Sequence, residues 1–245
     1  MRCKYLSFSL VVVTLISFAE TISAPPPAIE ASSYFLIDAN TNKIIAEKKS
    51  DERMPPASLT KIMTSYVVEN QIQQGLISPT DEVPISVKAW RAEGSKMFIR
   101  EGTTVLLSDL LKGVIIQSGN DASIALAEYV AGDEKSFAQM MNSQAQYLGM
   151  SNTHFMNSTG LPNSAHFSSA RDLARLTASL IEKYPEHYKT YAERSFKFNN
   201  INQPNRNRLL RYDRSVDGVK TGYTKAAGYC LVASSERDGM RLISV

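Results

Sequence analysis

The segments of this chain that are typical of β-strands lie near its two ends, and those with helical periodicity lie between them. Residues 33–38 and 43–47 are rich in β-branched and aromatic side chains, and the Asn-Thr-Asn between them predicts a hairpin. Four more strands are expected near the other end, at 196–198, 216–220, 229–234 and 241–245. This order favours an α+β domain in which N- and C-terminal strands form one antiparallel sheet and the helical middle packs on it.

The middle of the chain predicts five helices. In the first, apolar side chains recur at helical spacing from Leu59 to Val67, after two prolines and before a glycine stop at Gly75. Residues 76–107 predict loops and short strands. The other helices are expected at 110–117, 122–130, 137–148 and 173–181, and Ser118-Gly119-Asn120 separates the first two of these.

The N-terminus predicts a secretory signal peptide over residues 1–24. Arg2 and Lys4 precede an apolar run from residue 6 to 18, and small residues follow at Ala19 and Ala24, either of which fits a cleavage site. The run is shorter than the ~20 apolar residues that span a membrane. We therefore expect a protein that works outside the cytoplasm, with a Pro-rich linker at 25–30 and one domain at 31–245.

The composition excludes several classes of function. The 27 basic and 24 acidic residues give a formal net charge of +3 and are spread along the chain, so no nucleic-acid partner is expected. Two cysteines rule out a disulfide framework. His154, His166 and His187 have no partners at ligand spacing, so we expect no metal site and place all three on the surface or in loops.

The segment Ser58-Leu59-Thr60-Lys61 opens the first predicted helix. Positions i and i+3 share a helix face, which brings the Lys61 amine within reach of the Ser58 hydroxyl. A lysine whose pKa is lowered can take the proton of a serine and make it a nucleophile. Taken alone, the pattern equally fits a serine cap followed by a solvated lysine.

Two other segments have a structural and a functional interpretation. Ser118-Gly119-Asn120 is either a helix break, or a place where Ser118 relays a proton to a leaving amine and Asn120 binds substrate. Lys220-Thr221-Gly222 is either the end of a strand or a sheet edge that pairs with an extended peptide. In the second case Lys220 supplies positive charge and Gly222 lets the substrate backbone approach.

The order S-x-x-K, S-x-N, K-T-G is the motif set of the serine acyl-enzymes that recognise penicillin. From about residue 31 to the end, the chain strongly resembles low-molecular-mass penicillin-binding proteins of the D-alanyl-D-alanine carboxypeptidase type. The segments that carry the resemblance are 57–64 (ASLTKIMT), 118–122 (SGNDA), 152–155 (NTHF), 168–172 (SSARD) and 217–222 (DGVKTG).

The resemblance implies a β-lactamase/transpeptidase-like fold for residues 31–245, with no cofactor and no metal. It implies a periplasmic serine carboxypeptidase that removes the terminal D-alanine from peptidoglycan pentapeptide stems ending in D-Ala-D-Ala. Ser58 would attack the peptide carbonyl with Lys61 as general base, and Ser118 would complete the catalytic set. The Ser58 amide and an amide of the sheet edge would form the oxyanion hole. β-Lactam antibiotics would be covalent inhibitors.

The resemblance also implies the residues that bind substrate. Asn120 would line the cleft with Ser118, Lys220 and Thr221 would hold the terminal carboxylate, and Gly222 would admit the substrate backbone. Arg206 matches a family arginine near the rim of the cleft.

Part of the family pattern is missing. The family normally continues with another strand, a small all-β domain and an amphipathic helix that attaches it to the outer face of the inner membrane. This sequence stops at Val245, in the middle of an expected strand, before the point where a family arginine would help to bind the carboxylate. We therefore expect a fragment that lacks the membrane anchor.

Two alternative functions are compatible with the same cleft. A class A β-lactamase needs a glutamate to activate the deacylating water, usually in a Glu-x-x-Leu-Asn loop, and no such segment lies between Asn120 and Lys220. An inactive or slow cell-wall or penicillin-binding relative would keep the cleft without turnover. A classical Ser-His-Asp hydrolase would need a G-x-S-x-G elbow, which the sequence lacks.

Overall fold

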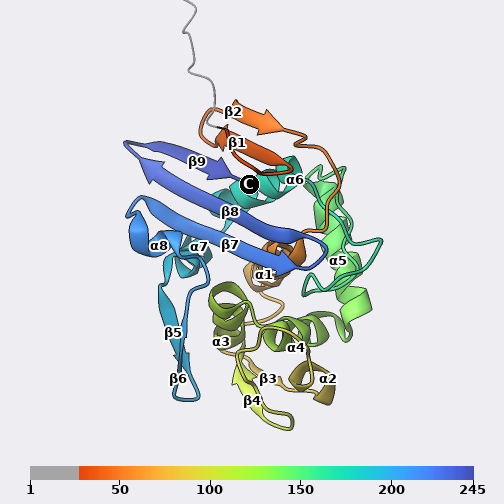
Figure 1. Ribbon diagram of the computed structural model, residues 1–245. Coiled ribbons are helices and arrows are strands. Elements are labelled where there is room, and N and C mark those ends of the chain that lie inside the picture. The colour runs from red at the N-terminus through yellow and green to blue at the C-terminus, as the bar shows by residue number, and fades with distance from the viewer. Residues whose placement is uncertain (1–27) are drawn as a thin grey trace, which may run out of the picture. The chain divides into compact units, whose positions relative to one another are not determined.

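The computed structural model describes residues 28–245, and the predicted signal peptide and residues 25–27 of the linker lie outside the described residues. A five-stranded sheet has the order β2-β1-β9-β8-β7, with every neighbouring pair antiparallel. N-terminal strands in orange therefore lie beside C-terminal strands in blue (Figure 1). The five strands are β1 (Tyr34–Asp38), β2 (Lys43–Lys48), β7 (Val216–Thr224), β8 (Gly228–Arg237) and β9 (Met240–Ser244).

The two ends of the domain meet where β1 pairs with β9. Ile37 lies opposite Ile243 in this register. Phe35 and Ile243 are both buried in the hydrophobic core, which extends from the sheet into the helices. The predicted α+β architecture, with one antiparallel sheet made from both ends of the chain, is confirmed.

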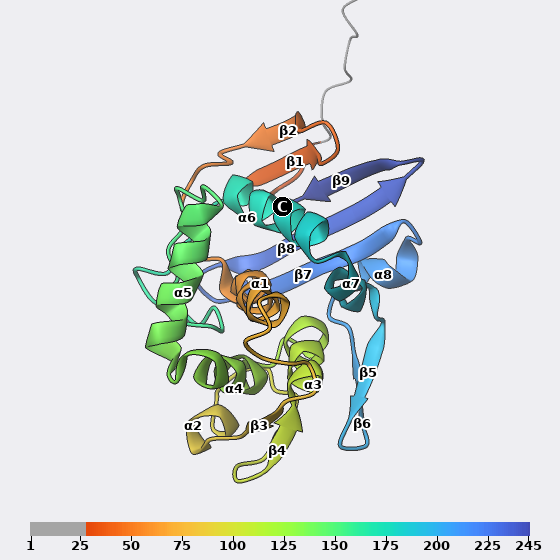
Figure 2. The ribbon, with the colours of Figure 1, turned by 180° about the vertical axis from the view of Figure 1, so that it is seen from behind.

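Helices cover one face of this sheet, as the view from behind shows (Figure 2). Helix α1 (Thr60–Gln73) is buried at every position from Thr60 to Val68, so its first half is enclosed in the core. Helix α6 (Ala170–Lys183) buries only one side, with leucines at 173, 176 and 180, which is the pattern expected of a helix lying on a sheet. The short α7 (Pro185–Tyr188) and the 3₁₀ helix η3 (Lys189–Ala192) follow it.

The remaining helices pack on the side of α1 away from the strands. They are α2 (Val87–Trp90), α3 (Leu107–Lys112), η2 (Gly113–Gln117), α4 (Asn120–Ala131) and α5 (Glu134–Tyr147), with α8 (Leu209–Tyr212) beside β7. Two small hairpins, β3 (Glu82–Pro84) with β4 (Thr104–Leu106) and β5 (Ser195–Phe198) with β6 (Ile201–Pro204), project from this layer (Figure 1). Among residues 28–245, no helix has both the length and the apolar content needed to cross a membrane.

The structure differs from the sequence predictions in several details. Residues 76–107, expected to form loops and short strands, also contain the short helix α2. The helix expected at 110–117 begins earlier, at Leu107, and its last part is the π-helical turn η2, which ends at Ser118. Strand β7 continues beyond Lys220 to Thr224, because its hairpin with β8 pairs as far as Thr224 and Gly228. The expectation that the histidines lie on the surface or in loops holds for His166, which lies in a loop although it is only 3% exposed. It is wrong for His187, which lies in the helix α7 and has a side chain only 7% exposed.

Candidate active site

Ser58 lies in a short 3₁₀ helix, η1 (Ala57–Leu59), that leads directly into α1. The residue before it, Ala57, has a φ of +48°, a left-handed conformation that is uncommon for a residue with a Cβ. Two glycines, Gly160 and Gly222, lie in close contact with this turn. A Cβ at Gly160 would overlap the Ala57 carbonyl oxygen, and a Cβ at Gly222 would lie 3.1 Å from the Ser58 amide nitrogen. The backbone around Ser58 is therefore held between β7 and the loop that contains Gly160.

Lys61 is 1% exposed, and its Nζ has three oxygen neighbours. These are Ser58 Oγ at 3.2 Å, Asn120 Oδ1 at 2.7 Å and the Thr159 carbonyl oxygen at 2.6 Å. Burial lowers the pKa of Lys61 well below its usual value, and the charge of Lys220 lowers this pKa further.

The three neighbours fix the direction of the amine. Carbonyl oxygens only accept hydrogen bonds, so both the Asn120 amide oxygen and the Thr159 carbonyl oxygen must receive an N–H. A neutral amine has two N–H groups and one lone pair. When Lys61 is neutral, its lone pair is therefore left to face the Ser58 hydroxyl, which is the geometry needed to accept that proton.

Asn120 is held at the first turn of α4 by the loop at residues 93–99. Its Nδ2 donates to the Glu93 carbonyl at 2.6 Å, which assigns the other end of the amide, Oδ1, to Lys61. The carboxylate of Asp121, the next residue, accepts from the amides of Met97 at 3.0 Å and Phe98 at 2.9 Å. The S-x-N segment thus fixes both the lysine and the loop.

Ser118 is 5% exposed and has a φ of +65°, in the left-handed turn between η2 and α4. The structure places it two residues before Asn120. Within residues 28–245, its hydroxyl forms no hydrogen bond with Lys61 or Lys220. Ser118 is therefore a predicted site residue that the structure does not bond to either lysine.

Lys220, Thr221 and Gly222 lie on β7, whose one strand partner in the described chain is β8, so no strand pairs with its other edge, which we call its free edge. Lys220 is 2% exposed, and its Nζ donates to the Thr221 carbonyl at 3.0 Å. Burial, together with the charge of Arg206, lowers the pKa of Lys220 to about 7. Arg206 itself is exposed and donates from Nε to Gln117 Oε1 at 3.3 Å.

No carboxylate of the described chain forms a salt bridge with Lys220 or Arg206. Two cations that influence each other without an acidic partner create a positive potential beside the free edge of β7, which suits an anionic ligand group. Residues 28–245 contain no group of three or more Cys, His, Asp and Glu side chains that could hold a metal ion.

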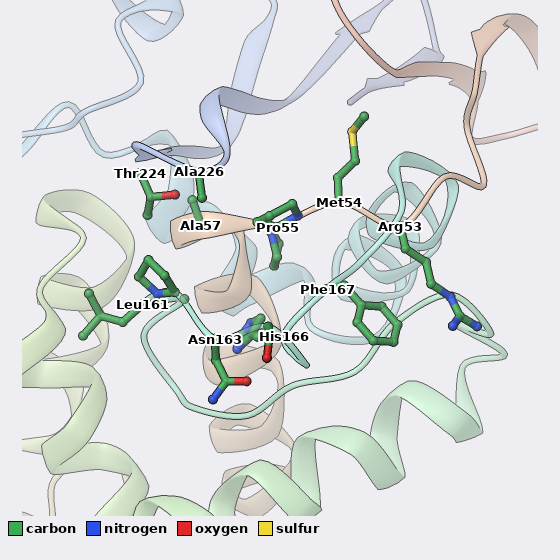
Figure 3. Close-up of a pocket in the computed structure, with 14 residues that line it drawn as sticks. Arg53, Met54, Pro55, Ala57, Leu161, Asn163, His166, Phe167, Thr224 and Ala226 are labelled. Atoms are coloured by element: carbon green, nitrogen blue, oxygen red, sulfur yellow. The ribbon is translucent and has the colours of Figure 1, made fainter.

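A cavity of 470 Å³ opens beside the turn at Ala57 (Figure 3). Leu161 and Asn163 of one loop line it, together with Thr224 from the end of β7 and Ala226 from the turn that follows. Ala57 lies on its wall, so an extended chain bound along β7 past Ser58 would run into this space.

Two features of the site carry no motif and were not predicted. The Thr159 carbonyl that contacts Lys61 and the Glu93 carbonyl that contacts Asn120 are backbone groups, which any residue provides. The sequence holds one signal next to the Thr159 carbonyl, which is the glycine at position 160. Gly160 has a φ of +84° and no room for a Cβ, so this turn requires a glycine.

Comparisons with known proteins find relatives of this chain in sequence and in fold. A family model described as D-alanyl-D-alanine carboxypeptidase matches residues 19–245. The D-alanyl-D-alanine carboxypeptidase DacC of Escherichia coli strain K12 is 48% identical over 236 residues, which are 94% of this chain and 59% of that protein. The chain thus spans less than two thirds of the length of this curated relative.

Two solved structures are similar over most of the chain. Penicillin binding protein 5 from Haemophilus influenzae has a TM-score of 0.88 and 47% identity, covering 90% of this chain and 66% of the other. Penicillin binding protein 6B from Escherichia coli has a TM-score of 0.87 and 42% identity, covering 92% and 73%. The β-lactamase/transpeptidase-like fold expected from the three motifs is thereby confirmed.

Proposed function

Because the chain belongs to the D-alanyl-D-alanine carboxypeptidase family, we propose that it removes the terminal D-alanine from peptidoglycan pentapeptide stems through an acyl-enzyme on Ser58. The single observation that carries this proposal is the contact between Ser58 Oγ and Lys61 Nζ, 3.2 Å apart at the start of a buried helix. A buried lysine with a lowered pKa, whose other two neighbours are carbonyl oxygens, is suited to take the serine proton.

The reaction begins when Ser58 Oγ attacks the carbonyl carbon of the D-Ala-D-Ala peptide bond and its proton passes to Lys61 Nζ. The Ser58 amide and an amide of the free β7 edge stabilise the oxyanion of the tetrahedral intermediate. The carbon–nitrogen bond then breaks, and Ser118 relays the proton held by Lys61 to the leaving amine of D-alanine. Lys61 then deprotonates a water, which attacks the carbonyl carbon of the ester. The bond to Ser58 Oγ breaks, the shortened stem peptide leaves as a carboxylic acid, and the proton on Lys61 returns to Ser58.

The free end of the substrate determines the specificity. The terminal carboxylate binds to Lys220 and Thr221, and Arg206 adds positive charge at the rim. Gly222 lets the substrate backbone lie close to β7 because it has no side chain in the way. Asn120 hydrogen-bonds the substrate amide in addition to holding Lys61.

The proposal also covers where the protein acts and which inhibitors it binds. The predicted signal peptide would deliver the protein to the periplasm, where peptidoglycan stems are present. For the family, attachment to the outer face of the inner membrane is the expected location. β-Lactam antibiotics acylate Ser58 as covalent inhibitors, because their strained amide resembles the D-Ala-D-Ala bond.

Two measurements test the proposal. Labelling with a fluorescent penicillin reports acylation of Ser58, and D-alanine release from a Lys-D-Ala-D-Ala peptide reports turnover. Both are expected. Labelling without release would favour a penicillin-binding relative that lacks turnover, and rapid hydrolysis of penicillin would favour a β-lactamase. Absence of both would contradict the proposal.

A further inference from the structure

A buried histidine lies close to the proposed general base without taking part in the reaction described above. The ring of His166 packs edge-on against Phe155, with 5.6 Å between ring centroids. Its Nδ1 lies 3.2 Å from the Met156 amide nitrogen, and its Nε2 lies 2.8 Å from Thr60 Oγ1. His166 therefore joins the loop that supplies the Thr159 carbonyl to the first residue of α1.

The two contacts determine the protonation of the ring. The Met156 amide can only donate, so Nδ1 carries no proton. The proton is on Nε2, which donates to Thr60 Oγ1. Burial, with a smaller effect from nearby His154, lowers the pKa of His166 to about 4. In neutral solution the ring keeps this tautomer and both hydrogen bonds.

The loop from residue 156 to 160 has further attachments, and they lie beyond the residue that His166 binds. The Ser158 carbonyl accepts from Thr64 Oγ1 at 2.7 Å, one turn along α1. The Ser158 amide and hydroxyl both donate to Glu134 Oε1, at 3.2 and 2.9 Å. Of these groups, only His166 binds Thr60, the residue next to Lys61 in sequence. It therefore sets the position of the loop relative to the Lys61 amine.

We propose that His166 is a positioning residue for the general base. By bridging the Met156 amide and the Thr60 hydroxyl, it holds residues 156–160 against the start of α1 and keeps the Thr159 carbonyl on Lys61 Nζ. The ring does not touch the reacting atoms. It acts through the Thr159 carbonyl, which accepts an N–H of Lys61 and so leaves the lone pair of the amine facing Ser58. This inference rests on the proposed function, since it assigns a role in acylation.

Loss of the bridge has two consequences for Lys61. Its amine loses an obligatory acceptor, so its lone pair is no longer confined to the direction of Ser58. A displaced loop also admits water, and because burial is the largest cause of its lowered pKa, that pKa rises. Acylation then slows at neutral pH, and the acidic limb of its pH profile moves to higher pH.

Two matched pairs of variants test the role from both ends of the bridge. His166→Phe keeps a ring against Phe155 but removes both hydrogen bonds, whereas His166→Gln retains one acceptor and one donor. Thr60→Val keeps the shape of the side chain without its hydroxyl, whereas Thr60→Ser keeps the hydroxyl. The measurement is the second-order rate constant of acylation by penicillin, per folded protein, as a function of pH.

We expect His166→Phe and Thr60→Val each to lower the rate constant at neutral pH by roughly tenfold or more, with the acidic limb shifted upward. His166→Gln and Thr60→Ser should recover most of the rate and the wild-type limb. The charged groups that act on the Lys61 amine, Lys220 from β7 and Asp121 from α4, are the same in all variants.

The outcomes separate this inference from the proposed function. Failure of the wild-type protein to react with penicillin would contradict the function itself. A reactive wild type whose Phe and Val variants acylate at the same rate, or melt lower without any shift of the acidic limb, would show that His166 only stabilises the fold. If His166→Phe does not fold, the Thr60 pair decides by the same two criteria.

Discussion

Gly222 of β7 and Ser58 at the start of α1 are in contact through their backbones, without a side chain between them. A Cβ on Gly222 would lie 3.1 Å from the Ser58 amide nitrogen, 3.2 Å from Ala57 Cβ and 3.3 Å from the Leu59 amide nitrogen. All three are tighter than an ordinary van der Waals contact, and two of them involve backbone atoms. A methyl group at this position of the strand therefore fits only if β7 and the turn at Ser58, the proposed nucleophile, move apart.

Substitution of Gly222 by Ala should slow acylation more than it destabilises the fold. The methyl group must push β7 and η1 apart by a few tenths of an ångström, and displacements of this kind at a reacting centre are costly. We expect penicillin acylation to fall by about tenfold or more while the free energy of unfolding changes by about 1–2 kcal/mol. Stopped-flow acylation and urea unfolding measure the two effects. An unchanged acylation rate would show that the contact does not control the site.

Substitution of Ser58 by Ala should abolish covalent labelling and leave the fold intact. Within the described residues, the hydrogen bond of the Ser58 side chain is with Lys61 Nζ, and Lys61 keeps its two carbonyl acceptors in the variant. The change should therefore remove the proposed nucleophile with little effect on the fold. The free energy of unfolding should change by about 0.5 kcal/mol or less. Intact-protein mass spectrometry after exposure to penicillin is the measurement, and an adduct on the variant would refute the assignment of the nucleophile.

Substitution of Lys61 by Arg should also prevent acylation. A guanidinium keeps its proton at any working pH and has no lone pair to receive the serine proton. Its planar fork also cannot reproduce the contacts with Asn120 and Thr159 that the single amine makes. Acylation of this variant at a rate near that of the wild type would exclude Lys61 as the base.

The pH dependence of substrate binding should follow Lys220. Its pKa of about 7 lies below the usual value of 10.5, so the amine loses its charge as the pH rises through 7. Only the protonated form attracts a terminal carboxylate. Consequently kcat/KM for a D-Ala-D-Ala peptide should fall above about pH 7, and a bound carboxylate should shift the corresponding fall in kcat to higher pH.

The matched control for this prediction is Lys220→Arg, which keeps its charge across the whole range. The basic limb of kcat/KM should disappear in this variant even if its overall rate is lower. A basic limb that persists unchanged in the arginine variant would assign the titration to another group.

The sequence predicted the parts of the molecule that depend on local pattern. The terminal strands were visible because their residue types and turn signals are local, and the pairing of β1 with β9 follows from a shared core. The proximity of Ser58 and Lys61 was predictable because it is a property of three residues' spacing along a helix. The roles of Asn120 and Lys220 came from the family resemblance.

The parts that could not be predicted depend on contacts between distant backbone groups. The Thr159 carbonyl reaches Lys61 across 98 residues of sequence, and a carbonyl has no residue-specific signature. The burial of His166 was missed for a related reason. Its partners, an amide at residue 156 and a hydroxyl at residue 60, form no motif with it until the loop is folded against α1.

The last prediction concerns the fate of the acyl-enzyme that a β-lactam forms. Residues 149–169, the loop that supplies the Thr159 carbonyl, contain no aspartate or glutamate that could activate a water. Glu134, which contacts this loop, is already bound by the Ser158 amide and hydroxyl and forms a salt bridge with Lys88. Neither residues 149–169 nor Glu134 therefore offers a free carboxylate to the proposed ester, and in the proposed mechanism Lys61 activates the deacylating water.

A peptide ester and a penicilloyl ester should then behave differently. The leaving D-alanine diffuses away from the first, whereas the opened lactam keeps its amine tethered, where it obstructs the approaching water. Because each tenfold decrease in rate corresponds to only ~1.4 kcal/mol of barrier, the absence of one positioned base is enough to make the penicilloyl ester long-lived. Mass spectrometry after a short penicillin pulse should show one stable adduct on the peptide that contains Ser58. Rapid return of the free mass, with hydrolysed penicillin accumulating, would instead identify a β-lactamase.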